Sequence, residues 1–217
     1  MEIINLGKQN SVFNHFVSEL RDVNIQKDAM RFRRNIERIG EIFAYEISKK
    51  MTYENNEITT PLGISSESLM IEKPVLATVL RAGLPLHQGL LNYFDSSENC
   101  FISAFRKHKR GVDFEIKIEY MSSPDLEGKT VILCDPMLAS GSSMVLAVEA
   151  ILSKGKPKHI HVVVTIASSD GIQYFKENLP FINCTLWLGS EDKEMTAQSY
   201  IVPGLGDAGD LAFGEKK

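Results

Sequence analysis

The chain has 217 residues, of which 43% are hydrophobic and 24% are charged, and its formal net charge is −4. This composition is typical of a globular protein, and the length favours one domain over residues 1–217 rather than two very small ones. The negative net charge argues against broad binding of nucleic acid, and the sequence shows no charged-then-apolar leader or long apolar run that would predict export or membrane insertion.

Residues 1–72 are expected to form a helical and hairpin part ahead of the main sheet. Apolar side chains recur every three or four positions between Lys27 and Met51, which predicts an amphipathic helix. Residues 11–21 predict a shorter helix. The polar stretch 55–63 contains Asn-Asn and Thr-Pro turn signals and predicts a hairpin or a loop.

The middle of the chain alternates between short apolar runs and helix-like segments. The apolar runs are residues 74–80, 99–105, 131–135, 159–167 and 182–188, and the helix-like segments are 84–94, 143–154 and 171–179. Continuous apolar strands separated by helices are typical of an α/β fold. We therefore expect an open, mostly parallel sheet with helices on both faces.

The three cysteines, Cys100, Cys134 and Cys184, lie far apart and have no metal-ligand spacing. Their odd number suits a reducing cytoplasm better than a disulfide framework. We expect three buried thiols in a cytoplasmic protein.

One segment breaks the alternation of strands and helices. In "GVDFEIKIEYM", apolar and polar residues alternate strictly from Val112 to Tyr120. This pattern predicts a half-exposed antiparallel strand where a crossover helix is expected. From the pattern alone, residues 106–121 are therefore predicted to form an edge hairpin.

An acid and a run of small residues follow the apolar run that ends at Cys134, in "DPMLASGSS". The helix predicted from Ser143 begins with amide groups that have no intrahelical partner, and such amides favour an anion such as phosphate. Asp135 would repel phosphate and suits the hydroxyl groups of a sugar. The stretch predicts a site for a phosphorylated sugar, although an ordinary turn with a serine N-cap has similar residues.

Two arginines follow the carboxyl ends of predicted strands, Arg81 after residues 74–80 and Arg106 after residues 99–105. Guanidinium groups stay charged and bind phosphate oxygens in a bidentate manner. The alternative for Arg81 is a structural pair with an acid. The basic run 106–110 is either a solvated loop tip or an extension of the positive field over a polyanionic substrate.

The stretch "VPGLGDAGD" contains three glycines, a proline and two aspartates in nine residues. This composition argues against a helix and against a central strand, so residues 200–214 are predicted to form a shaped loop. Backbone groups beside bare glycines can approach a flat ligand and read its donors and acceptors. A disordered tail is the alternative, but the apolar residues around the glycines argue against it.

Four blocks of the sequence resemble those of uracil phosphoribosyltransferases. "DPMLASGSS" resembles the family's motif for phosphoribosyl pyrophosphate (PRPP), and "YIVPGLGDAGDLAFG" resembles its C-terminal uracil-binding signature. "VLRAGLPLHQGLL" and "LRDVNIQKDAMRFR" are similar to two further blocks, in the same order along the chain. The resemblance covers nearly the whole chain and implies a type I phosphoribosyltransferase fold, in which residues 106–121 form a β-arm, or hood, that flanks the site.

The resemblance implies that uracil and PRPP react to give UMP and diphosphate, with catalytic roles for Asp135, Arg106 and Asp207. The residues implied for PRPP are Arg81, Arg106, Asp135, Pro136, Met137, Leu138, Ala139, Ser140, Gly141, Ser142, Ser143 and Asp207. Those implied for uracil are Ile201, Gly206, Asp207 and Ala208. We expect Mg²⁺ held largely by PRPP oxygens, with no protein metal ligand. A homodimer or larger homo-oligomer is also implied, with GTP as a candidate activator.

Departures from the family pattern leave other functions open. Ser142 stands where the family has glycine, and it would cost about 1 kcal/mol if that position needs a positive φ. Together with the basic run 106–110, this residue suits a phosphoribosyltransferase-like regulatory protein that senses uracil nucleotides or binds RNA. An enzyme that acts on another base is the third alternative.

Overall fold

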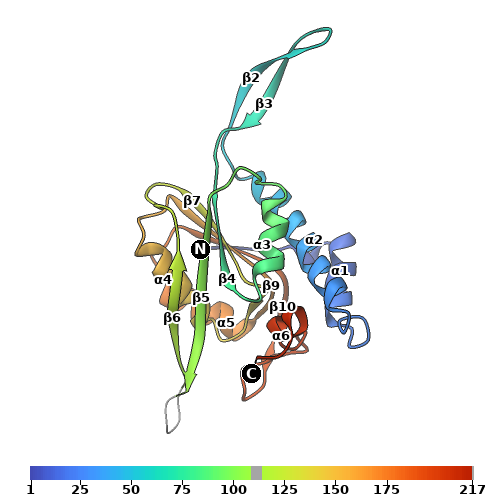
Figure 1. Ribbon diagram of the computed structural model, residues 1–217, viewed down its shortest axis with the longest axis vertical. Helices are drawn as coiled ribbons and strands as arrows, with labels where there is room; N and C mark the ends of the chain where they lie inside the picture. Colours follow the sequence, from blue (N-terminus) through green and yellow to red (C-terminus); the bar gives the residue numbers. More distant parts are fainter. Residues whose placement is uncertain (109–113, 217) are drawn as a thin grey trace.

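The computed structural model describes residues 1–108 and 114–216, and the side chains except those of residues 104–117. Within this part of the chain, an eight-stranded sheet has the order β1–β10–β9–β7–β4–β5–β6, with β8 also paired to β9 (Figure 1). Its strands are β1 (Glu2–Asn5), β4 (Val75–Leu80), β5 (Asn99–His108), β6 (Phe114–Ser122), β7 (Thr130–Cys134), β8 (Met137–Leu138), β9 (His159–Ser168) and β10 (Cys184–Asp192). All pairs are parallel except β5 with β6, which confirms the expected open, mostly parallel sheet.

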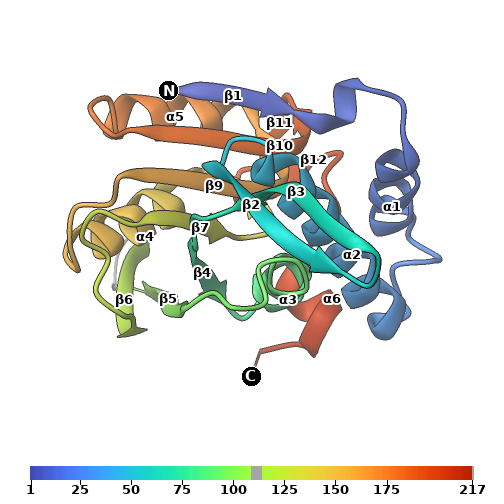
Figure 2. The same cartoon turned by 90° about the horizontal axis from the view of Figure 1, so that it is seen from above.

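Helices cover both faces of this sheet (Figure 2). They are α1 (Val12–Arg21), α2 (Ala29–Ser48), α3 (Leu84–Leu91), α4 (Ser142–Leu152), α5 (Ser169–Asn178) and α6 (Ala208–Phe213), with a short 3-10 turn η1 (Leu6–Lys8) after β1. Two buried apolar clusters, one with α4 and α5 and the other with α1, α2, α3 and α6, lie against the strands. Neighbouring residues of β7 alternate between them, since Leu133 belongs to the first and Ile132 to the second.

The segment that breaks the alternation is the edge strand β6, which runs antiparallel to β5 from Phe101↔Ser122 to His108↔Phe114. The predicted antiparallel strand is therefore confirmed. Tyr120 on this strand is exposed, as expected of a half-exposed edge. Lys109 and Arg110 of the basic run lie outside the described residues, as do the side chains of Arg106 and Lys107.

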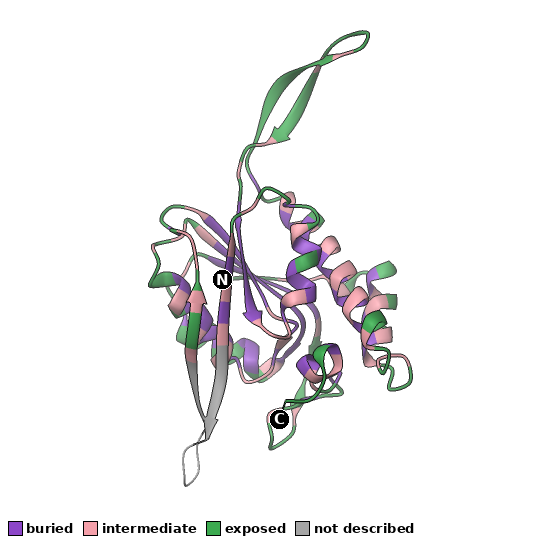
Figure 3. Cartoon of the chain, in the orientation of Figure 1, coloured by how far each residue is buried: buried purple, intermediate pink, exposed green. Residues whose placement is uncertain are grey.

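The N-terminal part holds two elements that differ from the prediction. The hairpin is longer than the expected stretch 55–63, because β2 (Tyr53–Thr60) pairs with β3 (Gly63–Met70) over its whole length. It projects from the body of the molecule and is exposed on both sides (Figure 3). With no buried side, these strands lack the alternation by which strands are recognised. Strand β1 was not expected, because it has only four residues, too few to show a strand pattern, and it is defined by its pairing with β10 at the edge of the sheet.

The turn after β4 is fixed by close packing of α3 on α2. A Cβ atom on Gly89 would lie 2.0 Å from the carbonyl oxygen of Glu37, and one on Gly40 would lie 2.4 Å from that of Leu86. Only glycine allows the two backbones to approach so closely. Helix α3, which directly follows the residues Arg81 to Gly83, is therefore held against α2.

All three cysteines are free and buried, as the sequence predicts. Burial raises the pKa of Cys134 and Cys184 to about 12, so both stay as thiols near neutral pH. In the described part of the chain, no helix has the combination of length and apolar content that a membrane span requires.

Candidate functional site

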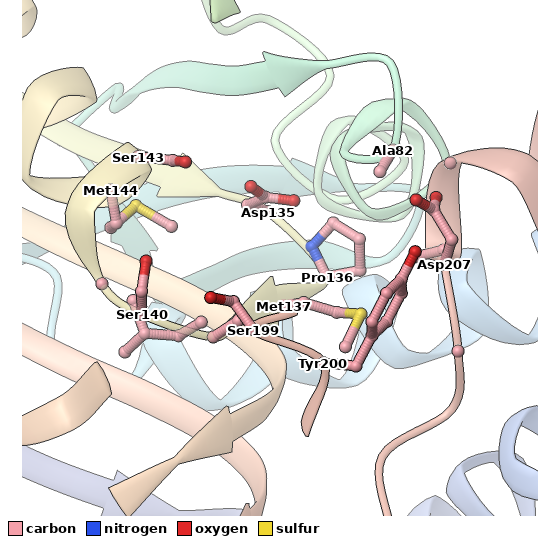
Figure 4. A pocket seen from close by; sticks show the side chains of 16 residues that line it. Ala82, Asp135, Pro136, Met137, Ser140, Ser143, Met144, Ser199, Tyr200 and Asp207 are labelled. Carbon is pink, nitrogen blue, oxygen red and sulfur yellow. The ribbon is translucent and has the colours of Figure 1, made fainter. Parts of the chain in front are cut away.

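A pocket with a volume of ≈180 Å³ lies at the carboxyl ends of the central strands, between two segments far apart in the sequence. The first segment is the turn of residues 135–143, called the 135–143 turn below. The second runs from Ser199 into α6 (Figure 4). The lining residues are Ala82, Asp135, Pro136, Met137, Leu138, Ala139, Ser140, Gly141, Ser143, Met144, Ser199, Tyr200, Gly206, Asp207, Ala208 and Gly209.

The first part of the 135–143 turn is attached to the sheet by backbone hydrogen bonds. The amide of Asp135 donates to the carbonyl of Val163 at 3.1 Å, and the carbonyl of Pro136 accepts from the amides of Thr165 and Ile166, both at 3.0 Å. Strand β8 then pairs with β9. The chain after β7 is therefore guided along its neighbour β9, and Asp135 is held at the floor of the pocket.

The second part of the turn is shaped by Gly141 at the start of α4. Gly141 has φ 83°, and a Cβ atom there would lie 2.7 Å from the carbonyl oxygen of Gly171. The carbonyl of Ala139 accepts a 2.6 Å hydrogen bond from the hydroxyl of Ser168, whose oxygen in turn accepts from the amide of Gly171. The first amides of α4 lack intrahelical partners and create a positive local field beside the pocket.

Ser142 does not have the strained backbone that the sequence left open. It is the first residue of α4, and the positive φ belongs to Gly141 before it. Its hydroxyl lies 2.8 Å from that of Ser140. The serine therefore fits the turn without the cost considered above. Ser140 and Ser143 line the pocket, whereas Ser142 does not.

The C-terminal side of the pocket contains a helix where the composition predicted a loop. Gly206 has φ 94°, and Asp207 then caps α6 by accepting a 2.9 Å hydrogen bond from the amide of Asp210. An aspartate N-cap stabilises a helix start enough to offset the low propensity of Gly209. Before this helix, β12 (Ile201–Val202) pairs with β11 (Glu194–Met195).

Two carboxyl groups face the pocket, Asp135 from β7 and Asp207 from the cap of α6 (Figure 4). Burial raises the pKa of Asp135 to about 7, and the negative charge of Asp207 acts in the same direction. The amide of Met137 and the charge of Lys216 oppose this rise. Near neutral pH, Asp135 therefore exchanges between a hydrogen-bond donor and a pure acceptor.

The structure brings most of the residues predicted for PRPP and uracil into this pocket, with four exceptions. Arg81 lies beside it and donates through Nη2 to the carbonyl of Gly214 at 3.1 Å and to Asp210 at 3.3 Å. A pair with an acid is what the structural alternative for Arg81 describes, and binding of phosphate by Arg81 stays a prediction. Ile201 is buried in the core, Ser142 faces Ser140, and the side chain of Arg106 lies outside the described residues.

Sequence reasoning did not assign five residues that line the pocket: Ala82, Met144, Ser199, Tyr200 and Gly209. Ser199 has φ 63°, and it is the only non-glycine residue with a positive φ in the part of the chain that the structure describes. It turns the chain so that Tyr200 lies at the pocket opposite Ser140 (Figure 4). Tyr200 begins the glycine-rich block, so its place in the sequence could have indicated that it lines the pocket. Nothing in the sequence indicated this for Ser199.

Comparison with known proteins gives a consistent result. The family described as uracil phosphoribosyltransferase matches residues 7–215. The chain is 57% identical to a uracil phosphoribosyltransferase of Porphyromonas gingivalis, with 100% of both chains covered. It is 36% identical to one of Sulfolobus acidocaldarius, with 92% of this chain and 94% of the relative covered.

Solved structures agree in fold. The AQ2163 protein of Aquifex aeolicus superposes with a TM-score of 0.85 at 28% identity, with 98% of both chains covered. A hypoxanthine phosphoribosyltransferase of Staphylococcus aureus gives a TM-score of 0.52 at 15% identity, with 86% of this chain and 84% of that chain covered. At that identity the second likeness concerns the fold alone.

Proposed function

The chain belongs to the uracil phosphoribosyltransferase family, and from this premise we propose that it converts uracil and PRPP to UMP and diphosphate. The observation that carries the proposal is the meeting of the 135–143 turn and the glycine-rich C-terminal segment, residues 200–214, at one pocket. The first segment suits a sugar phosphate, and the second suits a flat base. A phosphoribosyl transfer needs both ligands side by side.

The 135–143 turn would hold the phosphoribosyl group. The amides and hydroxyls of Ser140 and Ser143, with the amides of Gly141 and Ser142, suit the 5′-phosphate at the start of α4. Asp135 suits the ribose hydroxyls, because a carboxylate accepts hydrogen bonds from two neighbouring hydroxyl groups. The backbone of Pro136 to Ala139 would line the space between the two.

The C-terminal segment would hold uracil. The backbone groups of Gly206 and Ala208 line the pocket and can pair with the alternating donors and acceptors of a pyrimidine. Ile201 is buried beneath them, so only its backbone could take part. Asp207 would orient the base and approach PRPP. A base with the wrong edge would leave buried polar groups unpaired, which is the physical basis of selectivity.

The departing diphosphate would need positive charge, from Arg81, Arg106 and Mg²⁺. Among the described residues, no group of three or more His, Cys, Asp or Glu could hold a metal ion. The two carboxyl groups of the pocket fit a Mg²⁺ ion that keeps most of its ligands from phosphate and water. In place of the expectation of no protein ligand, we propose that Asp135 or Asp207 would also contact such an ion, which would supply charge stabilisation of the leaving group.

The experiment is an assay of the purified protein with labelled uracil, PRPP and Mg²⁺. Formation of UMP, with little competition from cytosine, hypoxanthine or orotate, supports the proposal. A preference for one of those bases would assign another substrate. No UMP above background, together with binding of RNA, would support the regulatory alternative instead.

Three further properties implied by the family belong to the same proposal: self-association, activation by GTP and a cytoplasmic location. Sedimentation velocity measures the first, with a dimer or larger species expected. Assays with and without GTP measure the second, with a higher rate expected when GTP is present.

A further inference from the structure

Two arginines of the N-terminal block "LRDVNIQKDAMRFR", Arg21 and Arg33, donate hydrogen bonds to backbone carbonyls of the C-terminal segment. We propose that Arg21, Asp192 and Arg33 are positioning residues that hold the base-binding segment in register with the 135–143 turn. The inference rests on the proposed function for the nature of the bound base. It assigns a role to the block "LRDVNIQKDAMRFR", none of whose residues lines the pocket.

Arg21, the last residue of α1, holds the entry to the segment. Its two terminal nitrogens each lie 2.8 Å from one carboxylate oxygen of Asp192, the last residue of β10. Nη1 also donates to the carbonyl of Gly204 at 2.9 Å, and Nη2 donates to the hydroxyl of Ser190 at 2.9 Å. The Asp192 side chain is only 6% exposed, so this pair is well shielded from water.

Gly204 is held from both sides by this pair. Its carbonyl accepts from Arg21, and its amide donates to Asp192 at 3.0 Å. Gly204 has φ 57° and stands two residues before Gly206 in the pocket lining. Because one ion pair satisfies both backbone groups of this glycine, the pair sets the direction in which the chain enters the pocket.

Arg33, on α2, holds the exit. Its Nη1 donates to the carbonyl of Ala212 at 2.6 Å, and its guanidinium carbon lies 6.0 Å from the centre of the Phe213 ring. Ala212 lies in the last turn of α6, where carbonyls lack intrahelical partners. The arginine satisfies one of them and neutralises the negative helix end.

The lining residues Gly206, Asp207 and Ala208 lie between these two attachments. Among the described residues, no strand ladder joins the segment to the main sheet, since its strand β12 pairs with β11 in a separate two-stranded sheet. Its distance from the 135–143 turn therefore depends on Arg21 and Arg33, on the contacts of Arg81 with Asp210 and Gly214, and on the apolar side chains that the segment buries. A shift of about 1 Å in a positioned group is enough to weaken a reaction strongly.

The test compares Arg21→Lys with a matched control, Arg31→Lys. Arg31 also makes a two-pronged pair with a carboxylate, Glu19, through contacts of 2.9 and 2.6 Å, but it does not contact the C-terminal segment. Lysine keeps the charge but cannot bridge a carboxylate and a carbonyl as the guanidinium fork does. In Arg21→Lys we expect KM for uracil to rise about tenfold, with KM for PRPP changed by less than about twofold. Arg31→Lys should leave both constants unchanged.

Hydrogen exchange gives a readout that does not depend on activity. Peptides covering residues 201–214 should exchange faster in Arg21→Lys than in the wild type and in Arg31→Lys. The carbonyl of Gly204 loses its donor, and Asp192, which accepts from the amide of Gly204, loses the guanidinium that fixes its position. If Arg21→Lys fails to fold, Asp192→Asn is used, with the same changes expected.

The outcomes separate this inference from the proposed function. The positioning role would be overturned if both lysine variants lost the same thermal stability while KM for uracil and hydrogen exchange of residues 201–214 stayed unchanged. A wild-type protein that forms no UMP would refute the proposed function. Hydrogen exchange alone would then decide whether Arg21 is a positioning residue. Faster exchange confined to residues 201–214 would support the positioning role, and unchanged exchange would overturn it.

Discussion

The two sides of the pocket are held in place by different means. The 135–143 turn is held by backbone hydrogen bonds to β9 and by Ser168, on the strand that neighbours its own. The C-terminal segment is held by side chains of α1 and α2, 183 and 179 positions earlier in the chain, and by Arg81 after β4. One side therefore takes its geometry from the sheet, and the other takes it from contacts between chain regions that are remote in sequence.

This difference indicates which changes each side should tolerate. Loss of one side chain leaves intact the backbone hydrogen bonds between the 135–143 turn and β9, so a steric overlap is needed to move the turn. The C-terminal segment has no such backbone hydrogen bonds to β9, so we expect the loss of one guanidinium group to move it. Variants that act on one side only should therefore separate the use of PRPP from the use of uracil.

The largest effect is expected at Asp207, which belongs to the C-terminal side but is predicted to reach both substrates. Asp207→Ala should lower kcat by about 100-fold or more, because a charged group positioned at the reacting atoms is lost. Stability should fall by only about 1 kcal/mol, the usual cost of an N-cap. Steady-state kinetics and thermal melting measure the two quantities.

Asp207→Asn is the matched control for the capping role, because asparagine keeps an oxygen for the amide of Asp210. It should melt like the wild type and still lose most of its turnover. Turnover close to that of the wild type in either variant would remove Asp207 from the mechanism.

The next effect is expected from Gly171→Ala, which acts on the 135–143 turn alone. A Cβ atom at Gly171 would lie 2.1 Å from the carbonyl oxygen of Ala139, so the turn must move. We expect KM for PRPP to rise about tenfold and stability to fall by about 1–3 kcal/mol. KM for uracil should change by less than about twofold.

Gly63→Ala serves as the control for Gly171→Ala, because nothing lies within 4 Å of a Cβ atom at Gly63. It should leave kinetics and stability unchanged. An equal rise of both Michaelis constants in Gly171→Ala would show that the two sides of the pocket do not move independently.

The smallest effect is expected in the pH dependence of stability, with opposite signs for one carboxylate on each side. Burial raises the pKa of Asp135 to about 7, above the value of about 3.9 in an unfolded chain. The native state therefore binds this proton more tightly than the unfolded chain does. The resulting stability is present below pH 4 and is lost as pH rises to about 7.

For Asp192, burial alone would raise the pKa, but hydrogen bonds from Arg21 and the amide of Gly204 outweigh it and lower the pKa. Its stabilisation is present above the unfolded value and is lost as pH falls through the lowered one. Urea unfolding from pH 3 to 8 measures both effects. The free energy of unfolding of Asp135→Asn should increase relative to that of the wild type as pH rises. Asp192→Asn should be less stable than the wild type near neutral pH, and this difference in stability should become smaller as pH falls towards 3. Parallel curves for the two variants would contradict this assignment.

The sheet and the 135–143 turn were predictable because their signals are local. Apolar runs, the acid after β7 and the small residues before α4 all lie within about ten positions of the structure they specify. The helix α6 was not predicted, because a cap at Asp207 and a positive φ at Gly206 outweighed a glycine-rich composition. Nothing local to Arg21 or Asp192 shows that they meet at Gly204.

Strand β1 and the hairpin of β2 and β3 show the same limit. A strand of four residues joins the sheet edge through its pairing with β10, which its own sequence does not reveal. The hairpin is exposed on both sides, so no alternation marks its length. Ser199 was missed because its positive φ belongs to a residue type that rarely adopts one.

The contact between Arg21 and Gly204 spans 183 positions, which has a consequence for folding during translation. A ribosome releases α1 and α2 while the residues that they are to grip have not yet been made. Until Leu205 and Ala212 are synthesised, the buried cluster that α2 shares with them is incomplete. Synthesis thus delivers the 135–143 turn first and the C-terminal segment last.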